Sequence, residues 1–359
     1  MKILITGNLG YVGPAVIDQL RASYPDATLI GLDIGYFAHC LTNTKHIPEC
    51  KLNVQYFCDI RNFPKDILKD VDAIVHLAAI SNDPIGNVNE EVTLDINYKA
   101  SIELAKAAKN AGVKTFVYAS SCSVYGFTEE GAVSENSSVN PLTAYAKSKV
   151  FTERELEKIA GKNFKVTSCR FATACGMSDR LRLDLVLNDF VASAVSTGKI
   201  TILSDGTPWR PLVNIKDMAL AIDWAINRKI SNGGEYLIIN IGSEEWNYKI
   251  KELADAVSRV IPNTDVVINK NASPDNRSYR VDFSLFKTLA LDYKPKHSLI
   301  STVNELKEGL ISIGFKDKDF CNSSFVRLKV LQGLKEKGLL SNDFKWTFSN
   351  IHKKAVTAS

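Results

Sequence analysis

The sequence predicts an α/β protein with a doubly wound parallel sheet and a smaller C-terminal α/β lobe. Three observations predict this fold class. Strand and helix patterns alternate over roughly the first 170 residues, the strands are nearly continuous apolar runs, and a glycine-rich turn joins the first strand to the first helix. Alternating elements require crossover connections, which produce parallel sheets buried on both faces.

The elements of this first part follow in a regular order. Apolar, β-branched runs predict strands at residues 2–6, 28–33, 54–59, 73–78, 115–120 and 165–171. Apolar residues three and four positions apart predict helices at residues 13–23, 92–110 and 144–160.

After about residue 170 the alternation becomes less regular. A polar loop from Ser178 to Asp184 leads into a helix, and a turn follows at residues 205–208. The later segments predict a strand that returns to the main sheet, an amphipathic helix and an outer helical tail, at residues 236–241, 248–260 and 325–338.

Composition and charge exclude several classes of protein. The hydrophobic content of 45% is typical of a globular protein, and a net charge of +4 without a basic stripe does not indicate a nucleic-acid surface. We find no signal peptide and no apolar run near the roughly 18 residues of a membrane span. The seven cysteines, odd in number and without a CxxC motif, favour reduced thiols and a cytoplasmic location.

A metal site is the alternative interpretation of the group His39, Cys40, His46 and Cys50. The first two residues are adjacent, and the later spacings fit no standard zinc knuckle. We therefore expect no metal and incidental thiols in a loop.

The glycine-rich turn predicts a Rossmann dinucleotide site. Gly7, Gly10 and Gly13 lie three apart between the first strand and the first helix. They permit, in that order, a tight turn, close approach of the backbone to a pyrophosphate, and close packing of the helix on the sheet. The free N–H groups of the helix N-terminus then favour phosphate.

Two acidic residues at strand ends predict the adenosine contacts. Asp33 ends the second strand, where a carboxylate accepts both ribose hydroxyls and repels a 2′-phosphate, so NAD is favoured over NADP. The alternative is a solvated aspartate without a ligand. Asp59, which ends the third strand, is placed to meet the adenine amino group.

Tyr145 and Lys149 form the predicted acid-base pair. They lie four apart on one helix and hence on one face, after a strand that ends near Ser121. A surface pairing is the alternative. A free tyrosine has a pKa of about 10, and Lys149 with the positive nicotinamide favours the phenolate, a change of about 3 units or roughly 4 kcal/mol. Ser121 would steady the reacting sugar oxygen.

With these residues assembled, the chain resembles the extended short-chain dehydrogenase/reductase family, in its NAD-dependent nucleotide-sugar epimerase/dehydratase branch. The resemblance reaches to about residue 315. It rests on Gly7/Gly10/Gly13, Asp33, Asp59-Ile60, His76-Leu77-Ala78-Ala79, Asn97, Ser121 before Val124-Tyr125-Gly126, and Tyr145/Lys149.

The resemblance implies further site residues, an NAD cofactor, a nucleoside-diphosphate sugar substrate and a homodimer formed by two helices. In addition to the residues above, it implies cofactor contacts from Leu9, Tyr11, Val12, Ile60, Leu77, Ala78, Ala79, Asn97 and Phe171. The implied substrate residues are Ser81, Ser121, Cys122, Ser123, Thr173, Arg182, Asn188, Arg210 and Arg277. For the last two arginines, solvated surface charges are the alternative.

Length and motifs together predict the domain organisation. A chain of 359 residues is longer than the length at which a single hydrophobic core usually stops growing. We expect an NAD-binding Rossmann domain over 1–170 with a return segment near 212–242. A sugar-nucleotide-binding lobe over 171–211 and 243–325 and a C-terminal helical extension over 326–359 complete the chain.

Departures from the family pattern narrow the predicted reaction. Family dehydratases carry an acidic pair where this chain has Cys122 and Ser123, and the decarboxylases tend to carry glutamate at the second position. Simple redox at one carbon, C4, remains. The leading hypothesis is a 4-epimerase that works through a transient 4-keto sugar by hydride transfer to and from bound NAD.

Other hypotheses stay open. Net C4 dehydrogenation or reduction is one, because the stretch from Arg180 to Phe190 resembles a branch with enzymes that oxidise nucleotide-linked heptoses. A thiol at Cys122 could serve 3- or 5-epimerisation. A hypothesis from another class, that the chain is a non-catalytic NAD-binding protein, conflicts with the intact set of Ser121, Tyr145 and Lys149.

Overall fold

Seven parallel strands form the central sheet of the computed structural model, which describes residues 1–42, 47–81, 89–269 and 278–347. The strand order is β11-β7-β5-β4-β1-β2-β3. The strands are β1 (Lys2–Thr6), β2 (Thr28–Asp33), β3 (Val54–Phe57), β4 (Ala73–His76), β5 (Thr115–Ser121), β7 (Lys165–Phe171) and β11 (Tyr236–Ile241). The order reverses between β1 and β4, where doubly wound sheets bind ligands.

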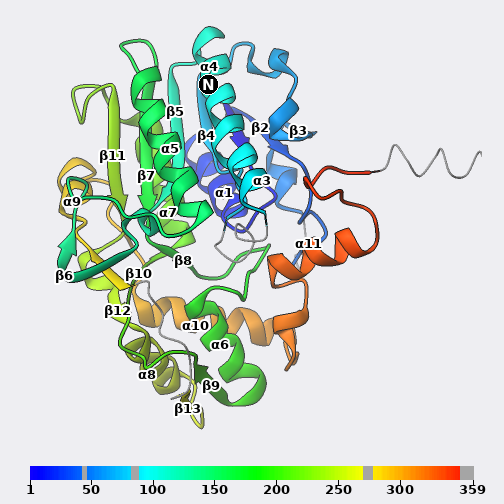
Figure 1. Cartoon of the computed structure of the whole chain (residues 1–359), viewed down its shortest axis with the longest axis vertical. Helices are drawn as coiled ribbons and strands as arrows, with labels where there is room; N and C mark the ends of the chain where they lie inside the picture. The colour runs from blue at the N-terminus through cyan, green and yellow to red at the C-terminus, as the bar shows by residue number, and fades with distance from the viewer. Residues whose placement is uncertain (43–46, 82–88, 270–277, 348–359) are drawn as a thin grey trace, which may run out of the picture.

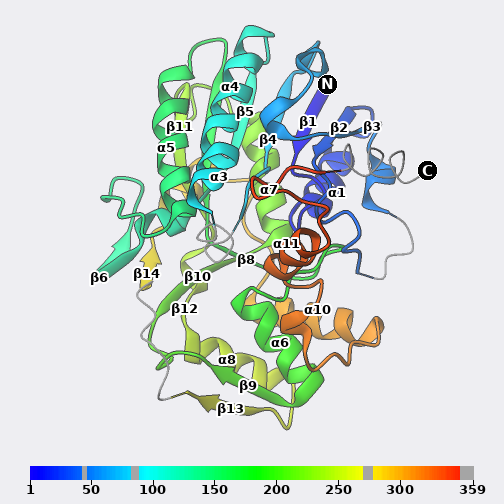
Figure 2. The same cartoon turned by 45° about the vertical axis from the view of Figure 1, so that its right-hand side comes forward.

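Helices cover both faces of this sheet (Figures 1 and 2). One face carries α3 (Glu90–Leu94), the π-helical turn η4 (Asp95–Lys99), α4 (Ala100–Asn110) and α5 (Ala144–Ile159). The other face carries α1 (Gly13–Ser23) and α7 (Ile215–Asn227), which pack on each other. Each face has its own apolar core, with Phe116 and Leu156 in one and Val16 and Ile222 in the other.

A smaller lobe lies beyond the carboxyl ends of the strands (Figure 1). Its helices are α6 (Val186–Thr197), α8 (Ile250–Val260) and α10 (Leu299–Ser312), and α9 (Ser284–Leu289) packs near β11. Short strands accompany them: β8 (Thr173–Cys175), β10 (Trp209–Asn214) and β12 (Asn247–Lys249) pair together, as do β9 (Lys199–Ile202) with β13 (Asp265–Ile268), and β6 (Phe127–Val133) with β14 (Ser278–Val281).

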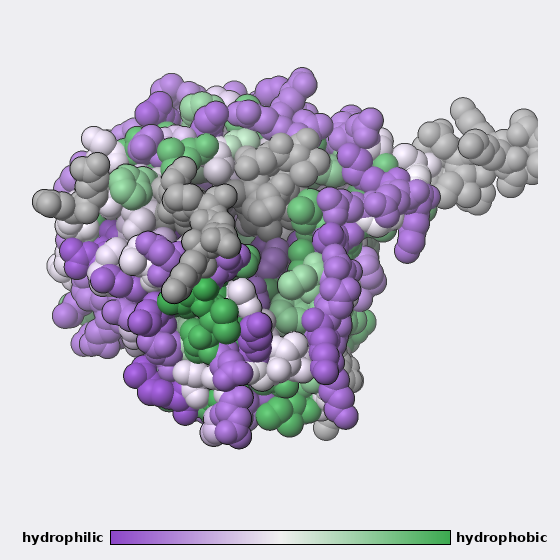
Figure 3. All heavy atoms as spheres, turned by 60° about the horizontal axis from the view of Figure 1, so that its bottom comes forward, coloured by the Kyte–Doolittle hydropathy of each residue, from purple (hydrophilic) through white to green (hydrophobic). Residues whose placement is uncertain are grey.

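The face of the molecule seen in Figure 3 is mainly hydrophilic, with apolar side chains in separate patches. The exposed apolar side chains of the lobe include Leu203, Val267, Ile300 and Ile311. Among the described residues, no helix combines the length and apolarity needed to cross a membrane.

The chain continues from the lobe into α11 (Arg327–Glu336) and then turns back toward the sheet. Residues 340–347, which we call the strap, lie beside the ends of β2 and β3 (Figures 1 and 2).

The predicted fold class is confirmed. The predicted strands of the sheet match the observed ones to within about two residues, and 236–241 joins the sheet beside β7. α7, α9 and α10 were not predicted, nor were the short strands of the lobe.

Candidate functional site

The glycine turn after β1 has the shape that a phosphate group requires. Gly7 has a φ of +74°, and a Cβ there would lie 2.5 Å from the backbone nitrogen of Ala78. A Cβ on Gly13 would lie 1.9 Å from the carbonyl oxygen of Asn8. No side chain caps α1 at Val12, and its first turn contains no acidic residue, so its N–H groups point to an anion site.

Asp33 at the end of β2 holds this turn in place. Its carboxylate accepts the N–H of Leu9 at 3.1 Å and the N–H of Gly35 at 2.7 Å. Burial raises the pKa of Asp33, although both hydrogen bonds oppose the rise. A carboxylate has about four lone-pair sites, so two remain for ribose hydroxyls.

Asp59 at the end of β3 is bound by Arg61. The Arg61 Nε lies 3.0 Å from both carboxylate oxygens, and Nη2 lies 2.6 Å from Oδ2. The neighbouring Ile60 is buried. The contact of Asp59 with adenine stays a prediction. Asp59 would have to make it while its carboxylate is bound by Arg61.

The loop after β4 is fixed by Asn97. This buried side chain lies in the π-helical turn and accepts the N–H of Ile80 at 2.8 Å. It donates to the Ile80 carbonyl oxygen at 2.9 Å and to Ser148 Oγ at 3.3 Å. Asn97 therefore positions the loop of Leu77, Ala78 and Ala79, and its own cofactor contact stays a prediction.

Tyr145 and Lys149 lie on the same face of α5, as predicted, beside the end of β5. The Lys149 Nζ is 5.3 Å from the centre of the Tyr145 ring and donates to the carbonyl oxygen of Ala119 at 2.7 Å. Thr143 caps the start of α5 by accepting the N–H of Ala146. Burial lowers the pKa of Lys149 to about 7, although Glu153 opposes this change.

The residues that follow β5 differ in orientation. Ser121 Oγ accepts the N–H of Ser123 at 3.2 Å, while the Ser123 hydroxyl is buried without a hydrogen-bond partner among the described residues. Cys122 is fully buried, and its thiol donates to the carbonyl oxygen of Arg170 at 3.1 Å. This placement argues against the predicted substrate contact of Cys122.

Four predicted site residues meet where the lobe joins the sheet. Arg182 pairs with both carboxylate oxygens of Asp184 at 2.9 Å and donates to Ser81 Oγ at 3.0 Å. Asn188 donates to the carbonyl oxygen of Arg182 at 2.8 Å and to the Tyr11 hydroxyl at 2.9 Å. Burial opposes the charge of Arg182, but Asp184 and, more weakly, Tyr11 and Tyr145 raise its pKa.

The remaining predicted residues lie around this junction. Phe171, at the end of β7, is buried and pairs in register with Ser121, and Thr173 begins β8. Arg210 in β10 is buried and donates to the carbonyl oxygen of Trp209 at 2.9 Å, so it is not a solvated surface charge. Arg277 lies outside the described residues.

No cluster of three potential metal ligands occurs in the part of the chain that the structure describes. His39 and Cys40 are neighbours, with Nε2 and Sγ 3.8 Å apart, and His46 lies outside the described residues.

A buried ion pair behind Lys149 was not predicted. Glu153 binds Arg170 through two hydrogen bonds of 2.9 and 2.7 Å and accepts the Ser120 hydroxyl. Glu153 follows Lys149 by four residues and so continues the face of Tyr145. That spacing could have drawn attention to Glu153 in the sequence, whereas no sequence pattern indicates Arg170 on β7 as its partner.

Comparison with known proteins adds the family context. The profile of the NAD dependent epimerase/dehydratase family matches residues 3–242. A UDP-glucose 4-epimerase from Lactobacillus helveticus is 28% identical over 328 residues, which is 84% of this chain and 94% of that protein. UDP-glucuronic acid decarboxylase 2 from Arabidopsis thaliana is 25% identical over 306 residues, 83% of this chain and 66% of that protein.

A solved structure shows the same architecture. The UDP-glucuronic acid 4-epimerase from Bacillus cereus, in complex with UDP-glucuronic acid and NAD, is 25% identical and aligns with a TM-score of 0.75. The alignment covers 87% of this chain and 100% of that chain.

Proposed function

The chain belongs to the NAD-dependent epimerase/dehydratase family, and from this membership we propose that it is a 4-epimerase of nucleoside-diphosphate sugars. Proteins similar to it are named for 4-epimerisation and for decarboxylation, so the family alone leaves the reaction open. The arrangement of side chains around Tyr145 supports the narrower choice.

One observation carries the proposal: Ser121, Tyr145 and Lys149 are all present, and Cys122 and Ser123 stand where the family's dehydratases carry an acidic pair. Ser123 stands where the decarboxylases tend to have glutamate, and Cys122 faces Arg170. Glu153 and Asp184 are each bound by an arginine. A second proton abstraction, which elimination requires, therefore lacks the acidic pair that the family's dehydratases use for it.

The structure fits the family's NAD cofactor. The Gly7 and Gly13 backbone leaves no room for a Cβ, and the first turn of α1 offers N–H groups to phosphate. In this proposal Asp33 binds the ribose, and Asp59 with Ile60 contacts the adenine. NAD bound there would supply the acceptor and donor of the hydride at C4 of the sugar.

The protein's own residues move the proton and hold the substrate. Tyr145 takes the proton of the C4 hydroxyl, and the charge of Lys149 favours its phenolate form. Ser121 donates a hydrogen bond to the same oxygen. In this proposal Arg182, Asn188 and Arg210 bind the polar groups of the sugar nucleotide.

Location and assembly belong to this proposal as well. The seven free cysteines suit a cytoplasmic enzyme, and a homodimer formed by two helices is the arrangement that the resemblance implies.

The test is a panel of UDP-, dTDP-, GDP- and CDP-sugars incubated with the purified protein. Absorbance near 340 nm and product NMR are followed together. Inversion at C4 without NADH accumulation is the expected result. Net accumulation of NADH with a released keto sugar would instead establish a C4 dehydrogenase.

Tyr145→Phe should abolish turnover while NAD and substrate still bind. The phenyl ring keeps the packing of α5 but has no proton to exchange. Turnover and ligand affinities of the variant are compared with those of the wild type, and retained activity would remove Tyr145 from the acid-base role.

A further inference from the structure

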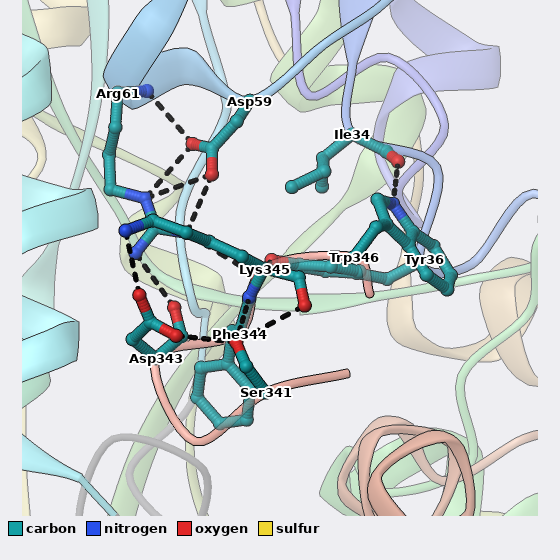
Figure 4. A network of polar contacts seen from close by, with 9 residues as sticks. All are labelled: Ile34, Tyr36, Asp59, Arg61, Ser341, Asp343, Phe344, Lys345 and Trp346. Carbon is teal, nitrogen blue, oxygen red and sulfur yellow. Dashed lines mark hydrogen bonds and ion pairs between the residues drawn. The ribbon is translucent and has the colours of Figure 1, made fainter. Parts of the chain in front are cut away.

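The strap is tied to the loops that follow β2 and β3 (Figure 4). The indole nitrogen of Trp346 donates to the carbonyl oxygen of Ile34 at 2.8 Å, and the Tyr36 hydroxyl donates to that of Phe344. Arg61 donates to the carbonyl oxygens of Asp343, at 2.7 Å, and Phe344, at 3.3 Å.

The strap has a defined structure of its own. Leu340 and Trp346 form an antiparallel bridge, and the Ser341 N–H donates to the Lys345 carbonyl oxygen at 2.9 Å. Phe344 is buried and has a φ of +53°, a region that bulky residues rarely adopt. Such a conformation persists only where the surroundings impose it.

The attachment points lie where a Rossmann fold places adenosine. Ile34 and Tyr36 follow Asp33, the predicted ribose ligand, and Arg61 follows and binds Asp59, the predicted adenine ligand. Dinucleotides bind beyond the carboxyl ends of such strands. The strap therefore contacts the two loops that carry both predicted adenosine ligands.

We propose that the strap is the outer wall of the adenosine end of the NAD site and retains NAD through successive turnovers. This inference rests on the proposed NAD site. Through Arg61 the strap also fixes Asp59, because the guanidinium binds the carboxylate on one side and two strap carbonyl oxygens on the other. NAD can leave only when these ties open.

The test weakens the ties while an aromatic ring stays at both positions. The full-length Tyr36→Phe/Trp346→Phe variant lacks the strap hydrogen bonds of the Tyr36 hydroxyl and the Trp346 indole nitrogen, and it keeps those of Arg61. Its matched control, Tyr24→Phe/Trp224→Phe, loses a tyrosine and a tryptophan hydrogen bond elsewhere, to Asp223 and to Leu289.

The rate at which bound NAD exchanges with isotopically labelled NAD is measured for each protein. We expect about tenfold faster exchange in the strap variant, the factor expected when two neutral hydrogen bonds are lost from a closed state, and an unchanged rate in the control. Equal rates in all three proteins would overturn the strap proposal while leaving the NAD site intact.

Two further outcomes would also overturn the strap proposal. Slower exchange or tighter NAD binding in the variant would mean that the strap competes with NAD, and a wild type that binds no NAD would overturn the NAD site together with the strap. If the variant does not fold, hydrogen exchange of strap amides in the wild type replaces it. NAD should slow that exchange, and an unchanged rate contradicts the proposal.

Discussion

Lys149 combines the charge proposed for catalysis with a buried position. Its side chain is 3% exposed, and burial lowers its pKa from 10.5 to about 7. Placing the charged form there costs at most about 4–5 kcal/mol. The residue that favours the Tyr145 phenolate is therefore expected to destabilise the fold.

Lys149→Met should abolish turnover and raise the free energy of unfolding by about 1–3 kcal/mol at pH 6. The penalty in the wild type is complete below pH 7, where the folded protein also holds the proton, and it shrinks as the pH rises from 7 toward 10.5. Denaturant unfolding of both proteins at pH 6 and pH 9 measures the increase in the free energy of unfolding, which should be smaller at pH 9. Lys147→Met, on the exposed side of α5, is the control. A less stable variant at pH 6 would mean that the contacts of Lys149 outweigh its burial.

Cys122→Ala should retain turnover within about threefold. Burial raises the pKa of the Cys122 thiol, which donates to Arg170, so it is a poor acid or base at neutral pH. Steady-state rates of the variant and of Ser121→Ala are compared on the same sugar nucleotide. A large loss in Cys122→Ala would restore the thiol to the mechanism and favour 3- or 5-epimerisation.

At the residue scale, the sequence predicted those positions whose type and spacing are local. Tyr145 and Lys149 are one helical turn apart, and the three glycines lie in seven residues. The Glu153–Arg170 pair joins a helix to a strand, and Arg182 reaches Ser81 across 101 residues of sequence. Such partners are set by the fold, so no local pattern indicates them.

At the scale of elements, the π-helical turn η4 places Asn97 between the loop after β4 and helix α5. The turn interrupts the helix between α3 and α4, and π-helical turns are frequent at functional sites. Its buried Asn97 binds the loop after β4 and reaches α5 through Ser148.

Asn97→Ala should lower the free energy of unfolding by about 2–3 kcal/mol, because both polar groups of Ile80 lose their partner inside the protein. The freed loop should also weaken NAD binding. Thermal unfolding and NAD titration measure both effects. Asn304→Ala, which removes an exposed helix hydrogen bond, serves as the control. Equal effects of the two substitutions would contradict the role given to Asn97.

Of the helices that the sequence did not predict, α7 is buried on nearly every side. Its buried residues run from Ile215 through Ile226, because the helix lies between the sheet and α1. A helix buried in this way shows the spacing of three and four less clearly than a surface helix does. In α10 the buried Leu299, Val303, Leu306 and Leu310 keep that spacing, so the sequence did carry a pattern for this helix.

At the scale of the molecule, Tyr11 joins the large domain to the lobe. Its hydroxyl donates to the Gly176 carbonyl oxygen at 2.6 Å and accepts from Asn188 at 2.9 Å. The residue comes from the glycine turn, so the predicted pyrophosphate site and the smaller lobe share one hydrogen-bonded group.

Tyr11→Phe should raise the KM for the sugar nucleotide several-fold and change NAD affinity less. Two buried groups of the lobe lose their partner, and stability should fall by about 1–3 kcal/mol. KM, NAD affinity and thermal unfolding are measured against Tyr24→Phe, which loses a comparable hydrogen bond to Asp223. An unchanged KM would show that the two parts do not depend on this contact.

The arrangement of the lobe and of the strap was beyond sequence-based prediction. The pairs β8–β10 and β13–β9 join short strands that are separated by dozens of residues, and Trp346 meets Ile34 across 312 residues. Short strands carry little periodicity, and a contact between chain ends leaves no local pattern.

The strand order has a consequence for synthesis on the ribosome. All strands of the sheet except β11 come from residues 2–171, and β11 begins only at Tyr236. At about 5–20 residues per second, roughly 3–13 s pass before β11 emerges and covers β7. During that time β7 is an open edge, the kind of strand on which nascent chains aggregate. Lys165 and Arg170, buried in the finished protein, lie on that edge, and their charges would discourage a neighbouring chain from pairing there.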